Sequence, residues 1–93
     1  MGSHDWNRTA VQRLILDAED TLKALDDALT QSNSNELTHA IRNGRQAYKE
    51  LARRRRSYLL TPLSATALEH LLSKIKGRLY ILREKIAYRI RRP

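Results

Sequence analysis

The sequence predicts an all-α fold, namely an up-down-up antiparallel three-helix bundle with heptad, coiled-coil-like packing. Three segments repeat their apolar residues at alternating spacings of three and four positions, the pattern of helices that pack side by side. Polar breaks at residues 31–35 and 61–62 separate the segments. If the chain folds back at both breaks, apolar residues of all three segments share the same levels, so one core can hold them.

The first helix is expected at about residues 7–31. Asn7 is its expected N-cap, because Trp6 and Val11 occupy the two positions of a hydrophobic staple. Residues 1–4 resemble the start of an expression tag, so the single domain is taken as residues 5–93. The predicted seam of this helix consists of Val11, Ile15, Ala18, Leu22, Leu25 and Leu29.

The second helix is expected at about residues 34–60. Asn33, with Glu36 three residues later, is similar to a capping box at its start. Gly44 costs about 1 kcal/mol in helix propensity. Its predicted level beside Leu22 and Leu79 indicates that the helices approach closely there. The predicted seam consists of Leu37, Ile41, Gly44, Tyr48, Leu51, Arg55 and Tyr58.

The third helix is expected at about residues 62–91. Thr61 followed by Pro62 is typical of an N-cap with proline at the first helical position. The register places Asp26 of the first helix opposite Arg78, and we expect these two side chains to form an ion pair. The predicted seam consists of Ala65, Leu68, Leu72, Ile75, Leu79, Leu82, Ile86 and Arg89.

Length and composition exclude several classes of protein. The 93 residues suffice for one modest core. The chain has no cysteine, which excludes disulfides and thiolate zinc sites, and nothing in it requires an oxidising compartment. Apolar runs are far shorter than the ~20 residues that span a bilayer. We therefore expect a cytoplasmic protein with no membrane partner.

Candidate catalytic and metal-binding groups do not converge. The register puts His39 and His70 ~20 Å apart at the helical rise, which excludes a metal pair. Inward positions are aliphatic except at the bundle ends, so no set of charged residues lies at mid-bundle to hold a substrate. Glycine-rich phosphate loops are absent as well. The sequence predicts a non-enzymatic protein that needs no cofactor.

Charge is distributed unevenly along the chain. Through Leu37 there are seven acidic and three basic residues, whereas from Thr38 onward there are fifteen basic and three acidic residues. The resulting net charge of +8 exceeds what a small domain needs to stay in solution. The usual partner of such a surplus is a polyanion, whose phosphates release counterions on binding.

Five cations on the second helix fall on neighbouring positions of the helical wheel, and we call them the basic stripe: Arg42, Arg45, Lys49, Arg53 and Arg56. Other arginines extend this predicted anion-binding surface toward the two ends of the bundle: Arg54, Arg89, Arg91 and Arg92. Tyr58 and Tyr88 lie beside arginines and are candidates for stacking on unpaired bases. The expected partner is RNA or DNA, bound through its backbone without sequence specificity, or an acidic protein surface.

The alternative is a protein-interaction module or small regulator. Two outward rows of the third helix are almost free of charge, and we call their C-terminal part the uncharged face: Tyr80, Ile81, Ala87 and Tyr88. Such a face can accept a helix from another protein or from a second copy of the chain, giving a homodimer. The sequence leaves both interpretations open.

Overall fold

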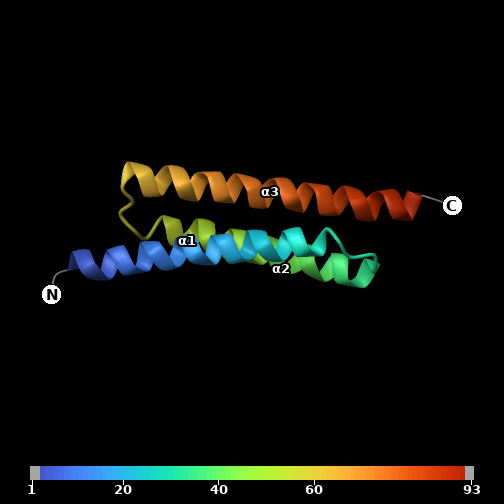
Figure 1. The fold of residues 1–93 in the computed structure, drawn as a ribbon, viewed down its shortest axis with the longest axis horizontal. Helices are drawn as coiled ribbons and strands as arrows, with labels where there is room; N and C mark the ends of the chain where they lie inside the picture. Colours follow the sequence, from blue (N-terminus) through green and yellow to red (C-terminus); the bar gives the residue numbers. More distant parts are fainter. Residues whose placement is uncertain (1–2, 92–93) are drawn as a thin grey trace.

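The computed structural model describes the backbone of residues 3–91 and the side chains of residues 6–89. Almost all of this part is helical, in α1 (Ser3–Ala28), α2 (Ser34–Arg55) and α3 (Pro62–Arg91), and it contains no strand. Each helix packs against the other two. Figure 1 shows the helices side by side along one long axis, with the chain doubling back at both connections. The prediction of an all-helical fold with three helices is confirmed.

The start of α1 differs from the predicted one. α1 begins at Ser3, so Asn7 lies inside the helix and is not its N-cap. The Asn7 side chain instead holds the connection between α2 and α3: its Nδ2 donates to the Leu59 carbonyl at 2.9 Å, and its Oδ1 accepts from the Leu59 amide at 3.2 Å. The side chain that the local sequence predicts to be a cap is therefore hydrogen-bonded to a residue 52 positions away.

The ends of α1 and α2 come earlier than predicted. α1 ends at Ala28, and the Thr30 and Gln31 amides then donate to carbonyls three residues back, which tightens the chain out of the helix. α2 ends at Arg55, and the amides of residues 56–58 make the same kind of bond. The Leu59 amide donates to Asn7 and not to a carbonyl of α2, so the helix does not extend to residue 60.

The two predicted caps at the helix connections are present. The Asn33 side chain accepts from the amides of Asn35 at 2.8 Å and Glu36 at 3.4 Å, and α2 begins at the next residue. Thr61 Oγ1 accepts from the Ser64 amide at 3.1 Å at the start of α3. Each bond satisfies an amide that has no partner within the first turn, which explains why both starts were predictable.

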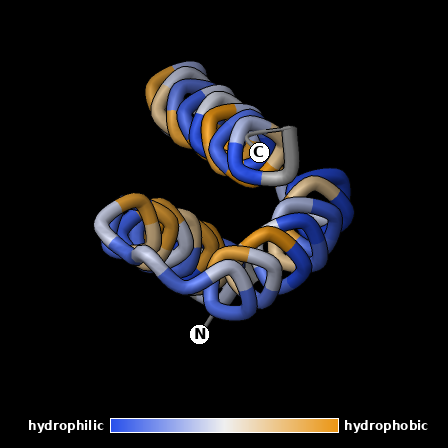
Figure 2. The backbone as a smooth tube through the Cα atoms, turned by 90° about the vertical axis from the view of Figure 1, so that its right-hand side faces the viewer, coloured by the Kyte–Doolittle hydropathy of each residue, from blue (hydrophilic) through white to orange (hydrophobic). Residues whose placement is uncertain are grey.

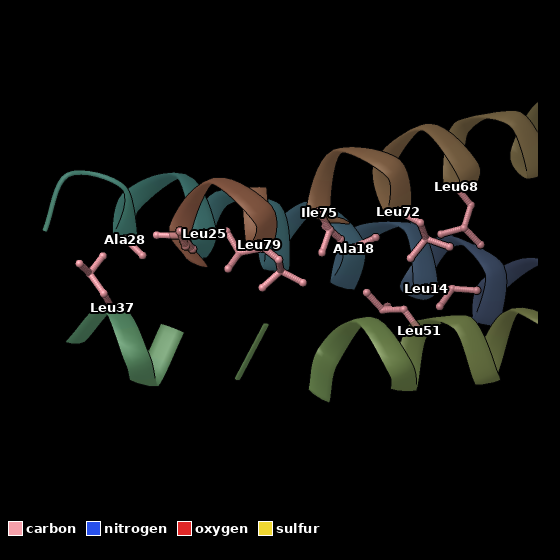
Figure 3. Packing of buried hydrophobic residues seen from close by; sticks show 11 residues of the cluster. Leu14, Ala18, Leu25, Ala28, Leu37, Leu51, Leu68, Leu72, Ile75 and Leu79 are labelled. Carbon is pink, nitrogen blue, oxygen red and sulfur yellow. The ribbon is translucent and has the colours of Figure 1, made fainter. Parts of the chain in front are cut away.

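All three helices contribute to the core. Figure 3 shows leucine, isoleucine and alanine side chains from all three meeting between the ribbons. Seen end-on in Figure 2, the helices surround a shared interior, and each carries hydrophobic and hydrophilic stretches. The buried apolar residues are Val11, Leu14, Ala18, Leu25, Ala28, Leu37, Leu51, Leu68, Leu72, Ile75, Leu79 and Leu82.

The face that α1 buries is rotated from the predicted seam. Leu14 and Ala28 are buried, whereas Ile15 and Leu29 are only half-buried. A helix in a three-helix bundle touches two partners, so its apolar stripe is wider than the two-position seam of a coiled coil. Val11, Ala18 and Leu25 belong both to the predicted seam and to the buried face.

Gly44 lies where the helices come closest. A Cβ atom at this position would be 2.8 Å from Leu25 Cδ2 and 2.9 Å from Leu79 Cδ2, so the absence of a side chain permits the contact. Leu79 is a predicted neighbour, and Leu25 takes the place of Leu22. Gly77 is different, because a Cβ atom there would meet no atom within 4 Å.

Candidate nucleic-acid interface

The basic stripe lies on the exposed surface of α2. Its five cations follow one another at spacings of three or four residues, which places them on one side of the helix. Within the described part of the chain, four of these side chains form no hydrogen bond or ion pair: Arg42, Arg45, Lys49 and Arg56. These four charges are therefore available to an external anion.

Arg53, the fifth cation, is neutralised by its own helix. Its Nη2 lies 2.5 Å from Glu50 Oε1 and its Nε lies 3.3 Å from Glu50 Oε2. The hydrogen bond from Arg53 and the charges of Arg53 and Arg54 lower the pKa of Glu50. Because Glu50 is charged at neutral pH, Arg53 contributes less to the stripe than its unpaired neighbours.

Arg54 and Arg55, which follow Arg53, each form an ion pair with another helix. Arg54 Nη1 lies 2.8 Å from Asp17 Oδ2 on α1, and this hydrogen bond raises the pKa of Arg54. Arg55 pairs with Glu69 on α3. Of the run 53–56, only the Arg56 side chain is without a partner among residues 6–89, so the run adds one free cation to the surface.

The cations of α3 that face α1 are also occupied. Arg78 Nε lies 2.6 Å from Asp26 Oδ1, the ion pair that the register predicts. Lys85 Nζ donates to the carbonyls of Leu29 at 2.6 Å and Gln31 at 3.2 Å, and Arg89 donates to the Ser32 carbonyl. α1 has no basic residue in its last turn, so α3 supplies the positive charge at its C-terminus.

Of the three predicted site residues near the C-terminus, the structure describes only the side chain of Arg89. Arg89 lies on α3, donates to the Ser32 carbonyl of the α1–α2 connection and is half-buried. The Arg91 side chain and the whole of Arg92 lie outside the described residues.

The cations of α3 that face α2 are free and line a groove. The α2–α3 groove, of about 350 Å³, is lined by Arg45, Tyr48, Lys49, Lys76, Leu79, Tyr80 and Arg83. Four of these residues are cationic and none is acidic. Lys76 and Arg83 were outside the predicted site, although their spacing of seven residues indicates that they share one face of α3.

A second hollow continues the groove along α2. Its volume is about 320 Å³, and Arg42 and Gln46 line it together with Arg45 and Lys49, which belong to both hollows. Thr38 and Ile41 complete its lining. The α2–α3 groove and the first three cations of the basic stripe, Arg42, Arg45 and Lys49, therefore form one connected cationic surface.

The tyrosines differ in what they contact. Tyr58 packs edge-on against Trp6, with ring centroids 6.0 Å apart, so it belongs to the end of the bundle. Tyr88, the other predicted stacking residue, is exposed but does not line the groove. Tyr48 is half-buried in the groove, and Tyr80 lines it with 66% of its surface exposed.

The uncharged face of α3 is largely open. Ile81 and Tyr88 are exposed by 46% and 65%, while Ala87 is half-buried. Tyr80 lies at its edge and faces the α2–α3 groove, so it belongs to both candidate surfaces. Three large apolar or aromatic side chains on one helix make a modest patch.

Other kinds of site find no support in the described residues. They include no group of three or more histidine, cysteine or carboxylate side chains that could hold a metal ion. His39 and His70 are both exposed. None of the helices in this part of the chain has the length and apolar character to cross a membrane.

Fold and surface define the class: a small three-helix protein with a cationic groove between α2 and α3. Comparisons with protein-family models, with curated proteins and with solved structures find no match to this chain. The geometry and charge of the surface are therefore the features that indicate its function.

Proposed function

We propose that this protein is a non-enzymatic helical module that binds nucleic acid through its phosphate backbone, using the α2–α3 groove and the basic stripe. The observation that carries the proposal is the groove itself, which is lined by four cations from two helices and by no carboxylate. Elsewhere on the bundle, the arginines and lysines that approach a neighbouring helix are paired, with Asp17, Asp26, Glu69 or main-chain carbonyls. An unpaired cluster of like charges repels itself, and an external polyanion relieves that repulsion.

Binding of this kind has a characteristic dependence on salt. A protein that neutralises Z phosphates loses affinity with a log–log slope of about −0.9Z on duplex DNA and about −0.7Z on single strands. The five free cations that line the two hollows are Arg42, Arg45, Lys49, Lys76 and Arg83. If they all contact phosphates, we expect slopes of about −3.5 to −4.5.

The test is a polarisation titration of labelled RNA and DNA at several salt concentrations between 50 and 200 mM. The double variant Arg45→Gln/Lys49→Gln removes two groove cations and should flatten the slope by roughly 1.4 to 1.8. The matched control Arg8→Gln/Lys23→Gln removes two exposed α1 cations that have no ion pair within the described chain. It should change the slope little. Equal effects of both variants would show that net charge, and not this surface, causes binding, and no binding at 50 mM would refute the function.

The detailed packing is also part of the proposal: an up-down-up antiparallel bundle with heptad seams. It is supported by the burial of α3 at Leu68, Leu72, Ile75, Leu79 and Leu82, spaced four, three, four and three residues apart. Contacts between distant levels support it as well, since Asp26 pairs with Arg78 near one end and Asn7 with Leu59 near the other. Cytoplasmic location and the lack of enzymatic activity stay predictions.

A second candidate function is protein–protein interaction through the uncharged face of α3. The exposure of Tyr80, Ile81 and Tyr88 favours it. The partner would be a helix of another protein, with an acidic surface that the neighbouring cations attract, or a second copy of the chain. Light scattering after gel filtration tests the homodimer: Ile81→Glu should convert a dimer into a monomer, and a wild-type monomer at high concentration excludes it.

A further inference from the structure

We infer that the α2–α3 groove selects single-stranded over double-stranded nucleic acid, with one base stacked on the ring of Tyr80 between phosphates held by the two walls. The inference rests on the proposed function and names the form of the nucleic acid that the same site takes. It depends on where Tyr80 lies relative to the four cations of the groove.

The cations stand on both sides of the Tyr80 ring. On α3, Lys76 precedes Tyr80 by four residues and Arg83 follows it by three, so all three lie along one side of the helix. On α2, Arg45 and Lys49 form the opposite wall of the same groove. A strand that runs along the groove therefore meets positive charge before, beside and after the aromatic ring.

The Tyr80 ring is free to receive a base. It is 66% exposed, and it forms no ring contact and no hydrogen bond within the described chain. Of the neighbouring groove residues, Leu79 is buried and Tyr48 is half-buried, and together they form a largely apolar floor beside it. A half-apolar, half-cationic hollow suits a nucleotide, whose base is flat and weakly polar and whose phosphate is charged.

The size of the groove disfavours a duplex. At about 350 Å³ the hollow is near the small end of ligand pockets, a size that suits one nucleotide but cannot enclose a duplex. A duplex keeps its bases stacked inside and presents only phosphates to such a surface. A single strand can turn a base outward onto an aromatic side chain, as sequence-tolerant single-strand binding proteins require.

The Tyr80 ring distinguishes this site from a surface that binds any polyanion. Heparin and duplex DNA present negative charge without an accessible base, so they can use the four cations but not the ring. An acidic protein helix has the same limitation unless it carries an aromatic residue. The contribution of Tyr80 is therefore the quantity that identifies the ligand.

The experiment measures the binding of four labelled probes to the 93-residue chain by fluorescence polarisation at 100 mM salt. The probes are a 12-nucleotide single-stranded DNA, an RNA of the same sequence, the 12-base-pair duplex and heparin. Tyr80→Leu keeps an apolar side chain but removes the ring, and it should weaken both single strands by about 5- to 150-fold, the range for loss of one base stack. Duplex and heparin affinities should stay within twofold. Tyr80→Phe should retain single-strand affinity, because it keeps the ring.

Tyr88→Leu is the matched control, since Tyr88 is equally exposed on the same helix but does not line the groove. It should leave all four affinities unchanged. Three outcomes overturn the inference: unchanged single-strand binding by Tyr80→Leu, equal weakening of all four probes, or a wild-type preference for the duplex. In each of them the protein still binds polyanions, so the proposed function survives. Only a failure of every probe to bind removes both.

Discussion

Asp26 and Arg78 join α1 to α3 through a contact of 2.6 Å between Oδ1 and Nε, and both side chains are partly exposed to solvent. The pair occurs where the helical register places it. Because solvent screens it, its contribution to stability is small, and a double-mutant cycle is needed to measure it.

We predict a coupling free energy of about 0.2 to 1 kcal/mol between Asp26→Asn and Arg78→Gln, decreasing with added salt. The measurement is urea unfolding of the wild type, the two single variants and the double variant. Asp27 serves as the control position, since its carboxylate has no ion pair in the described structure. Asp27→Asn combined with Arg78→Gln should show no coupling, and equal coupling for both carboxylates would contradict the pairing.

The two described helical glycines should respond oppositely to alanine. Both substitutions gain about 0.8 to 1 kcal/mol in helix propensity. At Gly77 nothing opposes the gain, because the new Cβ meets open space, so the melting temperature should rise by roughly 4 to 8 °C. At Gly44 the Cβ would lie under 3.0 Å from Leu25 and Leu79, and overpacking typically costs about 1 to 3 kcal/mol.

Thermal unfolding of both variants provides the check, and the difference between them isolates the packing term, since the backbone gain is the same. Gly44→Ala should be neutral to destabilised by about 2 kcal/mol. A Gly44→Ala protein as stabilised as Gly77→Ala would mean that the two leucines move aside without cost, and hence that the close approach does not depend on glycine.

Most of the fold follows from apolar periodicity and from caps that are local in sequence. The seams identified nearly all buried positions of α2 and α3, because the heptad pattern directly marks the side of a helix that packs. They were less successful for α1, where Leu14 is buried in preference to Ile15. Both residues are apolar and adjacent, so the choice depends on the rotation of α1 between its two partners, which no local pattern encodes.

The site was predictable only in part, and for a related reason. The spacing of cations on α2 predicts the basic stripe, but it does not reveal that Arg54 has Asp17 as a partner, 37 residues away. On α3, Lys76 and Arg78 are only two residues apart, yet one faces α2 and the other α1. Heptad spacing alone does not decide which of the two faces which helix, because it is the same for a left-turning and a right-turning bundle. The predicted Asp26–Arg78 ion pair makes that choice, so the position of Lys76 toward α2 could have been inferred from it.

Asn7 should stabilise the connection between α2 and α3. Asn7→Ala removes both hydrogen bonds to the Leu59 backbone and should cost about 1 to 2 kcal/mol in unfolding free energy. Amide exchange at Leu59 should accelerate at the same time, because its amide loses its acceptor. Thr30→Ala is a suitable comparison, since it also removes an exposed side-chain hydrogen bond, to the Asp27 carbonyl, but one within three residues. Unchanged exchange at Leu59 in Asn7→Ala would exclude the clamp.

Lys85 should act as a C-terminal cap for α1 supplied by another helix. Lys85→Met keeps the aliphatic part of the side chain and removes the ammonium group that binds the Leu29 and Gln31 carbonyls. We expect a loss of about 0.5 to 1.5 kcal/mol, from the charged hydrogen bonds and the helix dipole. Lys76→Met, at an exposed position without a partner in the described chain, should cost less than about 0.5 kcal/mol. Equal losses in chemical denaturation would show that Lys85 contributes only its charge to the whole molecule.

Glu50 should limit nucleic-acid affinity by neutralising Arg53. The hydrogen bond from Arg53 lowers the pKa of Glu50 below 4.5, so the ion pair stabilises the fold at pH values above the ordinary carboxyl pKa and is lost as the pH falls through the lowered one. An NMR titration should place the midpoint of Glu50 below its usual range, and Arg53→Met should return it upward. At neutral pH, Glu50→Gln imitates the protonated state and releases Arg53 to the basic stripe.

Affinity for nucleic acid should then increase, and the salt slope should steepen by about 0.7 to 0.9, the contribution of one further phosphate contact. Glu19→Gln is the matched control, because it changes the net charge by the same amount at an exposed α1 position without an ion pair among the described residues. It should raise affinity less and leave the slope unchanged, since a distant charge acts through a screened field and adds no contact. If both variants change the slope equally, Arg53 does not reach the ligand, and the binding surface ends at Lys49.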